Sequence, residues 1–366
     1  MKARGVTAGL LLLLAICPWP GSTASAGQIA FQTRRDGQAE IYAMNLDGSC
    51  QTNLTRHSSR DIHPAWSPDG TRIAFASDRK GTLQISVMDA DGGNPVQLTR
   101  GPGDRITPAW SADGTQIAYA SSELGTWDIC VMQADGSEAI NLTQSPSQDL
   151  WPTWSPDGTR IAFHSNRDRR GAFPRDVDPD GKMGWGPSDL FIMDSLGGAA
   201  TNLTARFSWG INMQPVWSPD GTRILSLTGN ITFDSHDLNY VVPQVWSLDP
   251  ELGERYAVDI GIGNLEAPKW SPDGQQVVFA AADDRMDAMQ EDHFSIGYDY
   301  EIYVIPTSGG GRKVAVNLTQ TRGCDSFPTW SPDWVPPLAG TSIESTTWGS
   351  LKAQSARLRQ SGAKKD

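Results

Sequence analysis

Trp-Ser-Pro-Asp-Gly stands at Trp66–Gly70, and its return along the chain determines the architecture. The other copies are Trp154–Gly158, Trp217–Gly221 and Trp270–Gly274, with Ala replacing Pro at Trp110–Gly114 and a truncated copy at Trp330–Asp333. The first three copies begin at residues 66, 110 and 154, so the repeat there is 44 residues long. Repeats of this length are typical of proteins that use one supersecondary unit many times.

Each copy introduces a unit of short strands. Trp66–Gly70 is followed by Arg72–Ser77, Gln84–Asp89 and Val96–Thr99, which are runs of β-branched and aromatic residues bounded by Gly, Pro, Asp and Ser. Such runs are typical of strands joined by tight turns. Pro suits the second position of a turn, and Gly tolerates the positive φ that completes it. Four antiparallel strands per unit, which we call A to D outward from the axis, predict one propeller blade.

The two ends of the chain predict how the units close. The first unit begins at Gln28–Thr33 without a preceding copy of the phrase, and the copy at Trp330 has no strand of this kind after it. The C-terminal strand A therefore completes the N-terminal blade. The predicted fold is all-β, a six-bladed β-propeller closed by pairing of the C-terminal strand with the N-terminal blade. The alternative is an open solenoid of the same units, whose end strands would be unpaired.

The segments outside the repeats predict export. Lys2 and Arg4 precede an apolar run, and Ala24–Ala26 has the A-x-A form of a cleavage site, so residues 1–26 read as a signal peptide cut near Ala26. The propeller is expected over residues 27–334 and a basic tail over 335–366, either frayed or with a short helix. We expect a periplasmic or secreted protein. No segment is apolar and long enough to predict a transmembrane helix.

The net charge is −12. A strongly acidic chain is repelled by nucleic-acid backbones and anionic membranes, which argues against both as main partners. The charge suits cationic protein surfaces, divalent cations or solubility alone.

The repeated unit resembles a known family. Trp-Ser-Pro-Asp-Gly-Thr-Arg-Ile-Ala-Phe, followed by an Ile-Tyr-Val-Met-Asp-like strand and Asn-Leu-Thr, is similar to the WD-repeat-like repeat of the TolB propeller domain, over about residues 28–334. TolB carries an N-terminal α/β domain ahead of its propeller, and this chain leaves no room for one, so we expect a stand-alone propeller. The resemblance does not carry TolB's role in the Tol–Pal system onto this chain. Related repeats also occur in some peptidases, but no Gly-x-Ser-x-Gly nucleophile elbow is present here.

Three B–C connections are much longer than the others. They follow Ile161–His164, Ile224–Leu227 and Val277–Ala280, and all are expected on the face that also carries the D–A loops. Insertions on one face commonly build a binding surface, although surface loops also lengthen neutrally. The candidate binding residues in the second and third loops combine acids, histidines and aromatics: Asp234, His236, Asp237, Tyr240, Asp292, His293, Tyr298 and Tyr300.

The first long connection contains alternating carboxylates. Asp176, Asp178 and Asp180 are followed by Gly181, which resembles the start of a calcium loop. We expect the Lys182 backbone carbonyl as a further ligand. Position 12 is Pro187 rather than Glu, so Asp189 would substitute for it. The alternatives are a calcium site and a plain polar turn.

A second candidate surface is the mouth of the central channel. A Pro stands two residues before the Trp of every copy, and the positions ahead of this Pro vary between blades. Side chains at variable positions near the axis are the ones expected to recognise a ligand. The candidate residues, five and three positions before each Trp, are Asp61, His63, Arg105, Thr107, Asp149, Trp151, Asn212, Gln214, Asp325 and Phe327.

Three functions are compatible with these patterns. The first is an exported scaffold that binds an envelope or extracellular protein, a peptide or a glycan through the channel mouth and the long loops. The second is an enzyme, a glycan lyase or hydrolase or a peptidase-like protein, acting at the channel mouth; we assign no catalytic residues, because no nucleophile–base pair is readable. The third is a structural propeller stabilised by calcium.

Overall fold

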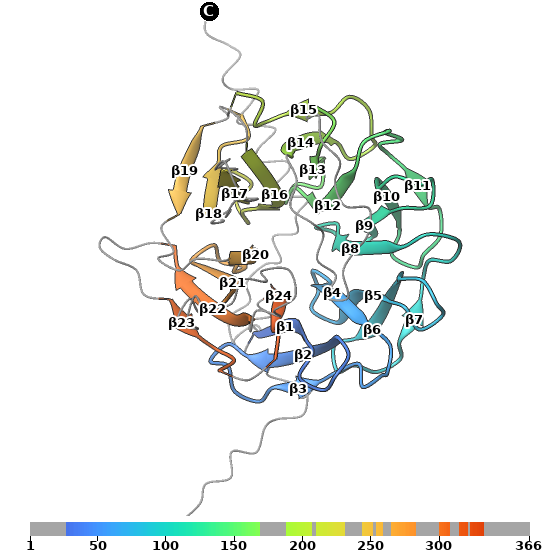
Figure 1. Ribbon diagram of the computed structural model, residues 1–366, viewed down its shortest axis with the longest axis vertical. Coiled ribbons are helices and arrows are strands. Elements are labelled where there is room, and N and C mark those ends of the chain that lie inside the picture. The colour runs from blue at the N-terminus through green and yellow to red at the C-terminus, as the bar shows by residue number, and fades with distance from the viewer. Residues whose placement is uncertain are drawn as a thin grey trace, which may run out of the picture. The chain divides into compact units, whose positions relative to one another are not determined.

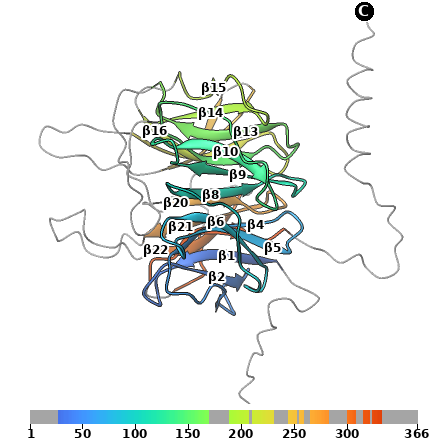
Figure 2. The same cartoon turned by 90° about the vertical axis from the view of Figure 1, so that its right-hand side faces the viewer.

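The protein is a ring of blades built from β-strands (Figures 1 and 2). The structure is a computed structural model that describes residues 27–168, 188–206, 210–230, 244–251, 254–258, 265–282, 300–307, 315–320 and 323–332. These residues form six four-stranded sheets, and the strand pairs within each sheet are antiparallel. The predicted all-β, six-bladed propeller is confirmed.

Each blade follows the order A to D that the repeat predicts. The inner two strands of blades 1 to 6 are β24 (Ser326–Trp330) and β1 (Gln28–Thr33), β4 (Asp61–Trp66) and β5 (Arg72–Ser77), β8 (Arg105–Trp110) and β9 (Gln116–Ser121), β12 (Asp149–Trp154) and β13 (Arg160–Ser165), β16 (Gly210–Trp217) and β17 (Ile224–Asn230), and β20 (Leu265–Trp270) and β21 (Gln276–Ala282). The outer two are β2 (Glu40–Asn45) and β3 (Thr52–Asn53), β6 (Gln84–Asp89) and β7 (Val96–Gln97), β10 (Asp128–Gln133) and β11 (Ile140–Asn141), β14 (Asp189–Asp194) and β15 (Thr201–Asn202), β18 (Gln244–Leu248) and β19 (Arg255–Val258), and β22 (Tyr300–Pro306) and β23 (Val316–Asn317).

The ring closes through blade 1, where the two ends of the propeller meet. β24 pairs antiparallel with β1, and Ile29 lies opposite Trp330. The Ser331 amide donates to the Gln28 carbonyl at 2.7 Å, and the Gln28 amide donates to the Ser331 hydroxyl at 2.6 Å. The predicted closure is confirmed and the open solenoid is excluded, because β24 covers the inner edge of β1 that an open array would leave unpaired.

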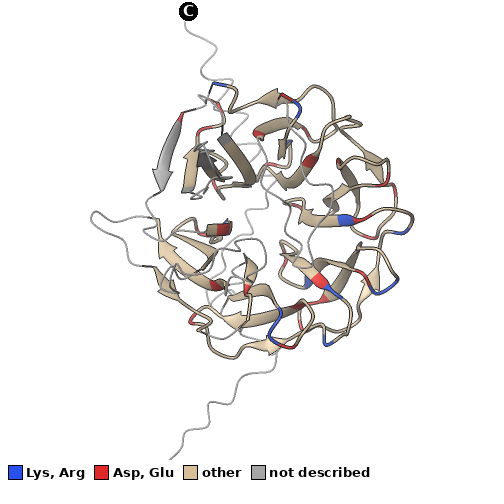
Figure 3. Cartoon of the chain, in the orientation of Figure 1, with Lys and Arg blue, Asp and Glu red and all other residues tan. Residues whose placement is uncertain are grey.

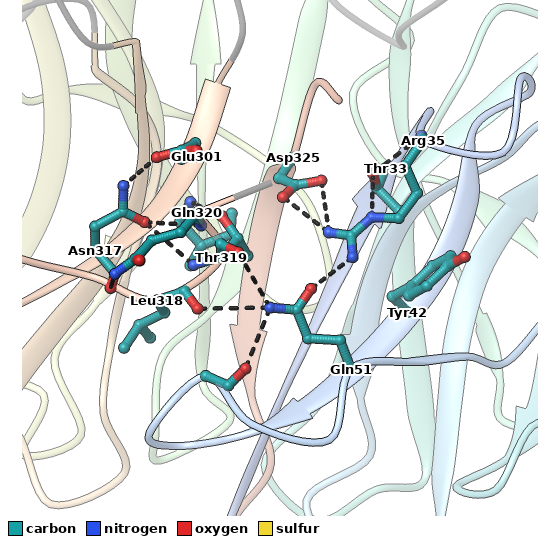
Figure 4. Close-up of polar contacts among 12 residues, drawn as sticks. Thr33, Arg35, Tyr42, Gln51, Glu301, Asn317, Leu318, Thr319, Gln320 and Asp325 are labelled. Atoms are coloured by element: carbon teal, nitrogen blue, oxygen red, sulfur yellow. Dashed lines mark hydrogen bonds and ion pairs between the residues drawn. The ribbon is translucent and has the colours of Figure 1, made fainter. Parts of the chain in front are cut away.

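Figure 4 shows a second link across the closure, between blades 1 and 6. Arg35 donates to both Asp325 carboxylate oxygens, at 2.9 and 3.1 Å, and to the Gln51 side-chain oxygen. The Gln51 amide group in turn donates to the carbonyls of Leu318 and Thr319 in blade 6, at 3.5 and 3.4 Å. Side chains as well as strand pairing therefore hold the ring shut.

The repeated phrase is a self-contained turn. The Gly70 amide donates to the Ser67 carbonyl at 2.9 Å, and Gly70 has a φ of +69°. Asp69 Oδ1 accepts hydrogen bonds from the Ser67 hydroxyl, the Thr71 hydroxyl and the Thr71 amide. The same contacts recur around Asp113, Asp157 and Asp220. The Asp side chain thus satisfies turn donors that would otherwise lack a partner.

In three copies, Trp110, Trp154 and Trp330, the Trp of the phrase joins its blade to the previous one by a hydrogen bond. The Trp110 indole donates to the Ala65 carbonyl at 3.1 Å, and the Trp154 indole donates to the Ala109 carbonyl at 3.1 Å. The Arg72 guanidinium lies over the Trp110 ring, 4.8 Å from its centroid, in a cation–π contact. The phrase therefore recurs because it builds the ring.

Asn-Leu-Thr in strand D has a structural role as well. The Thr143 hydroxyl accepts from the Ile129 amide at 3.0 Å and donates to Asp128 at 3.1 Å, and the Asn141 amide group also donates to Asp128, at 2.9 Å. Asp128 is the first residue of strand C in its blade. The motif anchors the short outer strand D onto strand C.

The core lies between neighbouring blades. Phe31, Phe75, Phe163 and Phe279 on the second strands are fully buried. The predicted signal peptide at residues 1–26 and the tail from residue 335 lie outside the described residues, so those boundaries stay predictions. In the part of the chain that the structure describes, there is no helix with the length and apolar character needed to cross a membrane.

Candidate functional site

Every inner strand bulges at the same place. Strand A of blade 2 pairs through Ile62 with Ala76 and through Ala65 with Ala74, so one extra residue is inserted on the inner strand. The equivalent residues all precede Pro and have positive φ values: His63 (56°), Thr107 (54°), Trp151 (56°), Gln214 (52°), Ala267 (49°) and Phe327 (51°). A positive φ is costly for Thr and for aromatic residues. The bulge is therefore a property of the fold and not of one residue type.

These six residues line an axial cavity of about 110 Å³. The cavity also contacts the residue immediately before each Trp: Ala65, Ala109, Thr153, Val216, Lys269 and Thr329. The bulge residues form a first ring around the axis and these six form a second ring, two positions further along each strand. Of the predicted channel-mouth residues, those three positions before each Trp are the bulge residues and line the cavity. Those five positions before each Trp do not line it.

Three aromatic side chains meet within the first ring. The rings of Trp151 and Phe327 stack at 5.2 Å between centroids, with 14° between their planes. The His63 ring lies edge-on to Trp151 at 4.9 Å and to Phe327 at 4.6 Å. Blades 4 and 1, which carry Trp151 and Phe327, lie opposite each other in the ring (Figure 1). Because the two rings stack, the aromatic cluster bridges the channel.

Side chains of the first ring and of the preceding blade hold several bulge amides. The His63 amide donates to the Gln32 side-chain oxygen at 2.9 Å, and the Ala267 amide donates to Gln214 Oε1 at 2.8 Å. The Gln214 amide donates to His164 Nδ1 at 3.4 Å. Burial lowers the pKa of His164 to about 3, so its ring is neutral at physiological pH and its Nδ1 is able to accept this bond.

The predicted carboxylates at the channel mouth form ion pairs within their own blades. Asp61 pairs with Arg79 at 2.9 Å, Asp149 with Arg167 at 2.7 Å, and Asp325 with Arg35 at 2.9 Å. All three carboxylates are fully buried. Burial raises the pKa of Asp61 above its ordinary value, and hydrogen bonds from Arg79 and Ser77 oppose this shift. These carboxylates join strand A to the end of strand B.

Blade 3 has the same pair with its charges exchanged. Arg105 occupies the position of Asp61, and Glu123 occupies the position of Arg79. Arg105 donates to Glu123 at 2.5 Å and is 4% exposed. Asn212 stands at this position in blade 5 and shares hydrogen bonds with Ser188 and Thr228. Figure 3 shows basic and acidic segments interspersed around the ring.

The predicted loop residues lie mainly outside the described residues. These are Asp234, His236, Asp237, Tyr240, Asp292, His293 and Tyr298 of the binding loops, and Asp176, Asp178, Asp180 and Lys182 of the calcium loop. Tyr300 begins β22 and is 8% exposed in the core between blades 6 and 1. Asp189 begins β14 and accepts from Thr204 and Asn202, as Asp128 does in blade 3. Calcium stays a prediction.

Sequence reasoning missed Lys269. When the copies are aligned on the Trp, the preceding column reads Ala, Ala, Thr, Val, Lys and Thr, and a single charged residue stands in it. That column could have identified Lys269. The sequence prediction places only the positions ahead of the Pro at the axis, and Lys269 follows the Pro.

Comparisons with known proteins agree with this architecture. Residues 19–103 and 97–173 match the family model of the TolB β-propeller domain. The Tol-Pal system protein TolB of Desulfosudis oleivorans is 49% identical over 43 residues, which are 12% of this chain and only 10% of that protein.

Solved structures share the ring. TolB from Acinetobacter baumannii superposes with a TM-score of 0.63 and 21% identity, over 84% of this chain and 67% of that chain. A putative TolB from Agrobacterium tumefaciens gives 0.57 and 21%, over 82% and 92%. A chain of a nidogen/laminin complex gives 0.56 and 12%, over 83% and 98%. At these identities the structural likeness concerns the fold, while the sequence match concerns the repeat itself. The chain therefore shares the propeller fold of these structures, and its residues 19–173 are similar to the TolB repeat.

Proposed function

We propose that the protein is an exported scaffold that binds a protein or peptide partner through its channel mouth and the long loops on the same face. The N-terminal segment 1–26 would direct export to the periplasm or beyond. The name of the similar protein from Desulfosudis oleivorans places that protein in a Tol-Pal system, which makes an envelope protein the first partner class to test.

The observation that carries this proposal is the contrast between constant backbone and variable side chains in the first ring. Six bulges with nearly identical φ present His, Thr, Trp, Gln, Ala and Phe. The aromatic cluster of His63, Trp151 and Phe327 lies among them, and Trp151 remains partly exposed. Partly exposed aromatic side chains at a concave site are typical of protein-binding hot spots.

The test is capture of a partner that depends on Trp151. The purified wild type, Trp151→Ala and the control Val96→Ala would each be immobilised and exposed to envelope extract. Val96 is 57% exposed on β7, which is the outermost strand of blade 2 and therefore the one furthest from the axis. Captured proteins would be purified, and their affinity measured directly.

We expect Trp151→Ala to weaken partner binding about 30-fold, or about 2 kcal/mol, because a hot-spot aromatic is lost. Val96→Ala should bind like the wild type. Circular dichroism would establish that both variants are folded. Equal partner affinity of Trp151→Ala and wild type would refute binding at the channel mouth. Binding of glycans that needs Trp151, with no protein captured, would replace the protein partner with a sugar.

A further inference from the structure

The second ring of the axial cavity contains one charged side chain. Lys269 stands on β20 among five small or apolar residues at the equivalent positions of the other blades. Among the described residues that line the cavity there is no Asp or Glu, and His63 is the other titratable group. The cavity is therefore locally cationic in a chain whose net charge is −12.

The Lys269 ammonium has no counter-ion within the described part of the chain. None of the ion pairs and side-chain hydrogen bonds there involves its Nζ. Burial lowers the pKa of Lys269 to about 8. An ammonium group held partly away from water without a counter-ion is unfavourable, so an anion that reaches it gains binding energy.

Two neutral donors line the same cavity. The Ala267 amide donates a hydrogen bond to Gln214 Oε1 at 2.8 Å. The Nε2 group of the same Gln214 side chain is then a donor without an acceptor among the described residues. Thr107 is 4% exposed, and its Oγ1 has no hydrogen-bond partner among the described residues. Ammonium, amide and hydroxyl thus come from blades 6, 5 and 3.

We propose that the axial cavity binds a carboxylate group, with the Lys269 ammonium as its counter-ion and the Gln214 amide and Thr107 hydroxyl as hydrogen-bond donors. A carboxylate carries one charge and two oxygens that each accept more than one hydrogen bond, which matches this donor set. A cavity of about 110 Å³ admits a group of several non-hydrogen atoms. The inference rests on the proposed function in that it names the chemical group that enters the same channel.

The experiment is isothermal titration of the full chain at pH 7 with three probes in a buffer without carboxylates. The probes are acetate, tri-alanine with a free carboxyl terminus, and tri-alanine amide. The variants are Lys269→Met, which removes the charge at similar length, and Lys80→Met, which removes an exposed lysine on a surface turn as a matched control.

We expect saturable binding of acetate or of tri-alanine acid, at least tenfold weaker in Lys269→Met and unchanged in Lys80→Met. Binding of acetate would assign a small free carboxylate, whereas binding of tri-alanine acid alone would assign the carboxyl end of a peptide. Tri-alanine amide should not bind. Absence of saturable binding, or equal binding by wild type and Lys269→Met, would overturn the proposal.

Gln214→Glu provides a second variant that separates the site from the fold. The Glu carboxylate can still accept from the Ala267 amide, and it would place a negative charge in the cavity that Lys269 also lines. Carboxylate binding should be lost while the melting temperature is kept or raised. Retained binding by folded Gln214→Glu would contradict the assignment. Partner capture that depends on Trp151 without any carboxylate binding would leave the proposed function standing and remove only this inference.

Discussion

The turn and the bulge of each inner strand lie a few residues apart, yet they keep their shapes by different means. At the turn, the side chains make the conformation, because Asp69 binds the hydroxyls and the amide around it. At the bulge, the backbone is equally constant but His, Trp, Ala and Thr serve alike. Pairing with strand B and contacts from neighbouring side chains impose the bulge, so its own side chain is free to vary.

This difference separates two ways in which a backbone shape is repeated from blade to blade. A turn built by side chains repeats its residues, and a sequence motif reveals it. The bulge repeats its φ values and the Pro that follows it, but not the side chain of the bulge residue itself. The strain of about 1 kcal/mol per residue is offset by the sheet around it. The channel therefore accepts new side chains without loss of the ring, which suits a binding site.

The largest loss of stability is expected when the ring closure, which positions both the turns and the bulges, is broken. A chain ending at residue 325 lacks β24, whereas a chain ending at residue 334 keeps it. The shorter chain should lose cooperative unfolding, because β1 then has an unpaired inner edge and blade 6 loses its neighbour. Thermal melting followed by circular dichroism would compare the two. Equal cooperative melting of both chains would show that closure does not stabilise the ring.

The next effect tests the buried ion pairs that flank the bulges. Arg79→Met should lower the free energy of unfolding by about 3 kcal/mol, because it leaves the fully buried Asp61 without its partner. The double variant Asp61→Arg with Arg79→Glu copies the exchanged pair of blade 3 and should recover much of this loss. Urea unfolding would measure both. No recovery in the double variant would mean that the two blades are not interchangeable at this pair.

A smaller effect of opposite sign is expected at the second ring. Lys269→Met should raise the free energy of unfolding at pH 7 by about 1 kcal/mol, because a partly buried charge is removed. The folded pKa of Lys269 is about 8 and its ordinary value is 10.5. Over this window the unfolded wild type binds more protons than the folded one, so the wild type gains stability as pH rises. The advantage of Lys269→Met should therefore shrink between pH 8 and 10.5 in urea unfolding. An advantage that is constant with pH would show that the ammonium is well solvated.

An effect of similar size but opposite sign is expected at a single turn. Hydrogen bonds from Ser111, with those from Thr115, hold the pKa of Asp113 below its usual value. A depressed carboxylate pKa adds stability above about pH 4, and this contribution is lost as pH falls through the folded pKa. Asp113→Ala should cost about 1 kcal/mol at pH 7, since three hydrogen bonds are removed at a largely exposed site.

Asp113→Asn is the matched variant for that turn, because it keeps an acceptor oxygen but does not titrate. It should retain most of the stability at pH 7 and show a weaker loss on acidification than the wild type. Unfolding by urea at pH 7 and pH 3 would compare all three proteins. The same acid sensitivity in Asp113→Asn and wild type would assign the acid response to other carboxylates.

The predicted strands, blade number and closure followed from local signals. Pro68 and Gly70 act through their own backbone preferences, and the β-branched runs after them repeat with a constant spacing. The candidate site followed only in part. His63, Trp151 and Phe327 were expected at the channel mouth, but the sequence does not show that their rings touch. Asp61 was expected there too, and its pairing with Arg79 depends on strand register, because the two residues are 18 apart in sequence.

The repeat alone determined that this chain forms a ring of six blades, because turn chemistry and strand patterning act over a few neighbouring residues and recur with each copy. The tertiary structure decided which of the predicted axial side chains line one cavity, and it added Lys269 to them. Lys269, Gln214 and Thr107 come from three blades, and they line one cavity only because closure brings distant strands around a common centre. The recurring Pro marks the bulge position in each strand, but only the closed ring decides which of these side chains touch one another.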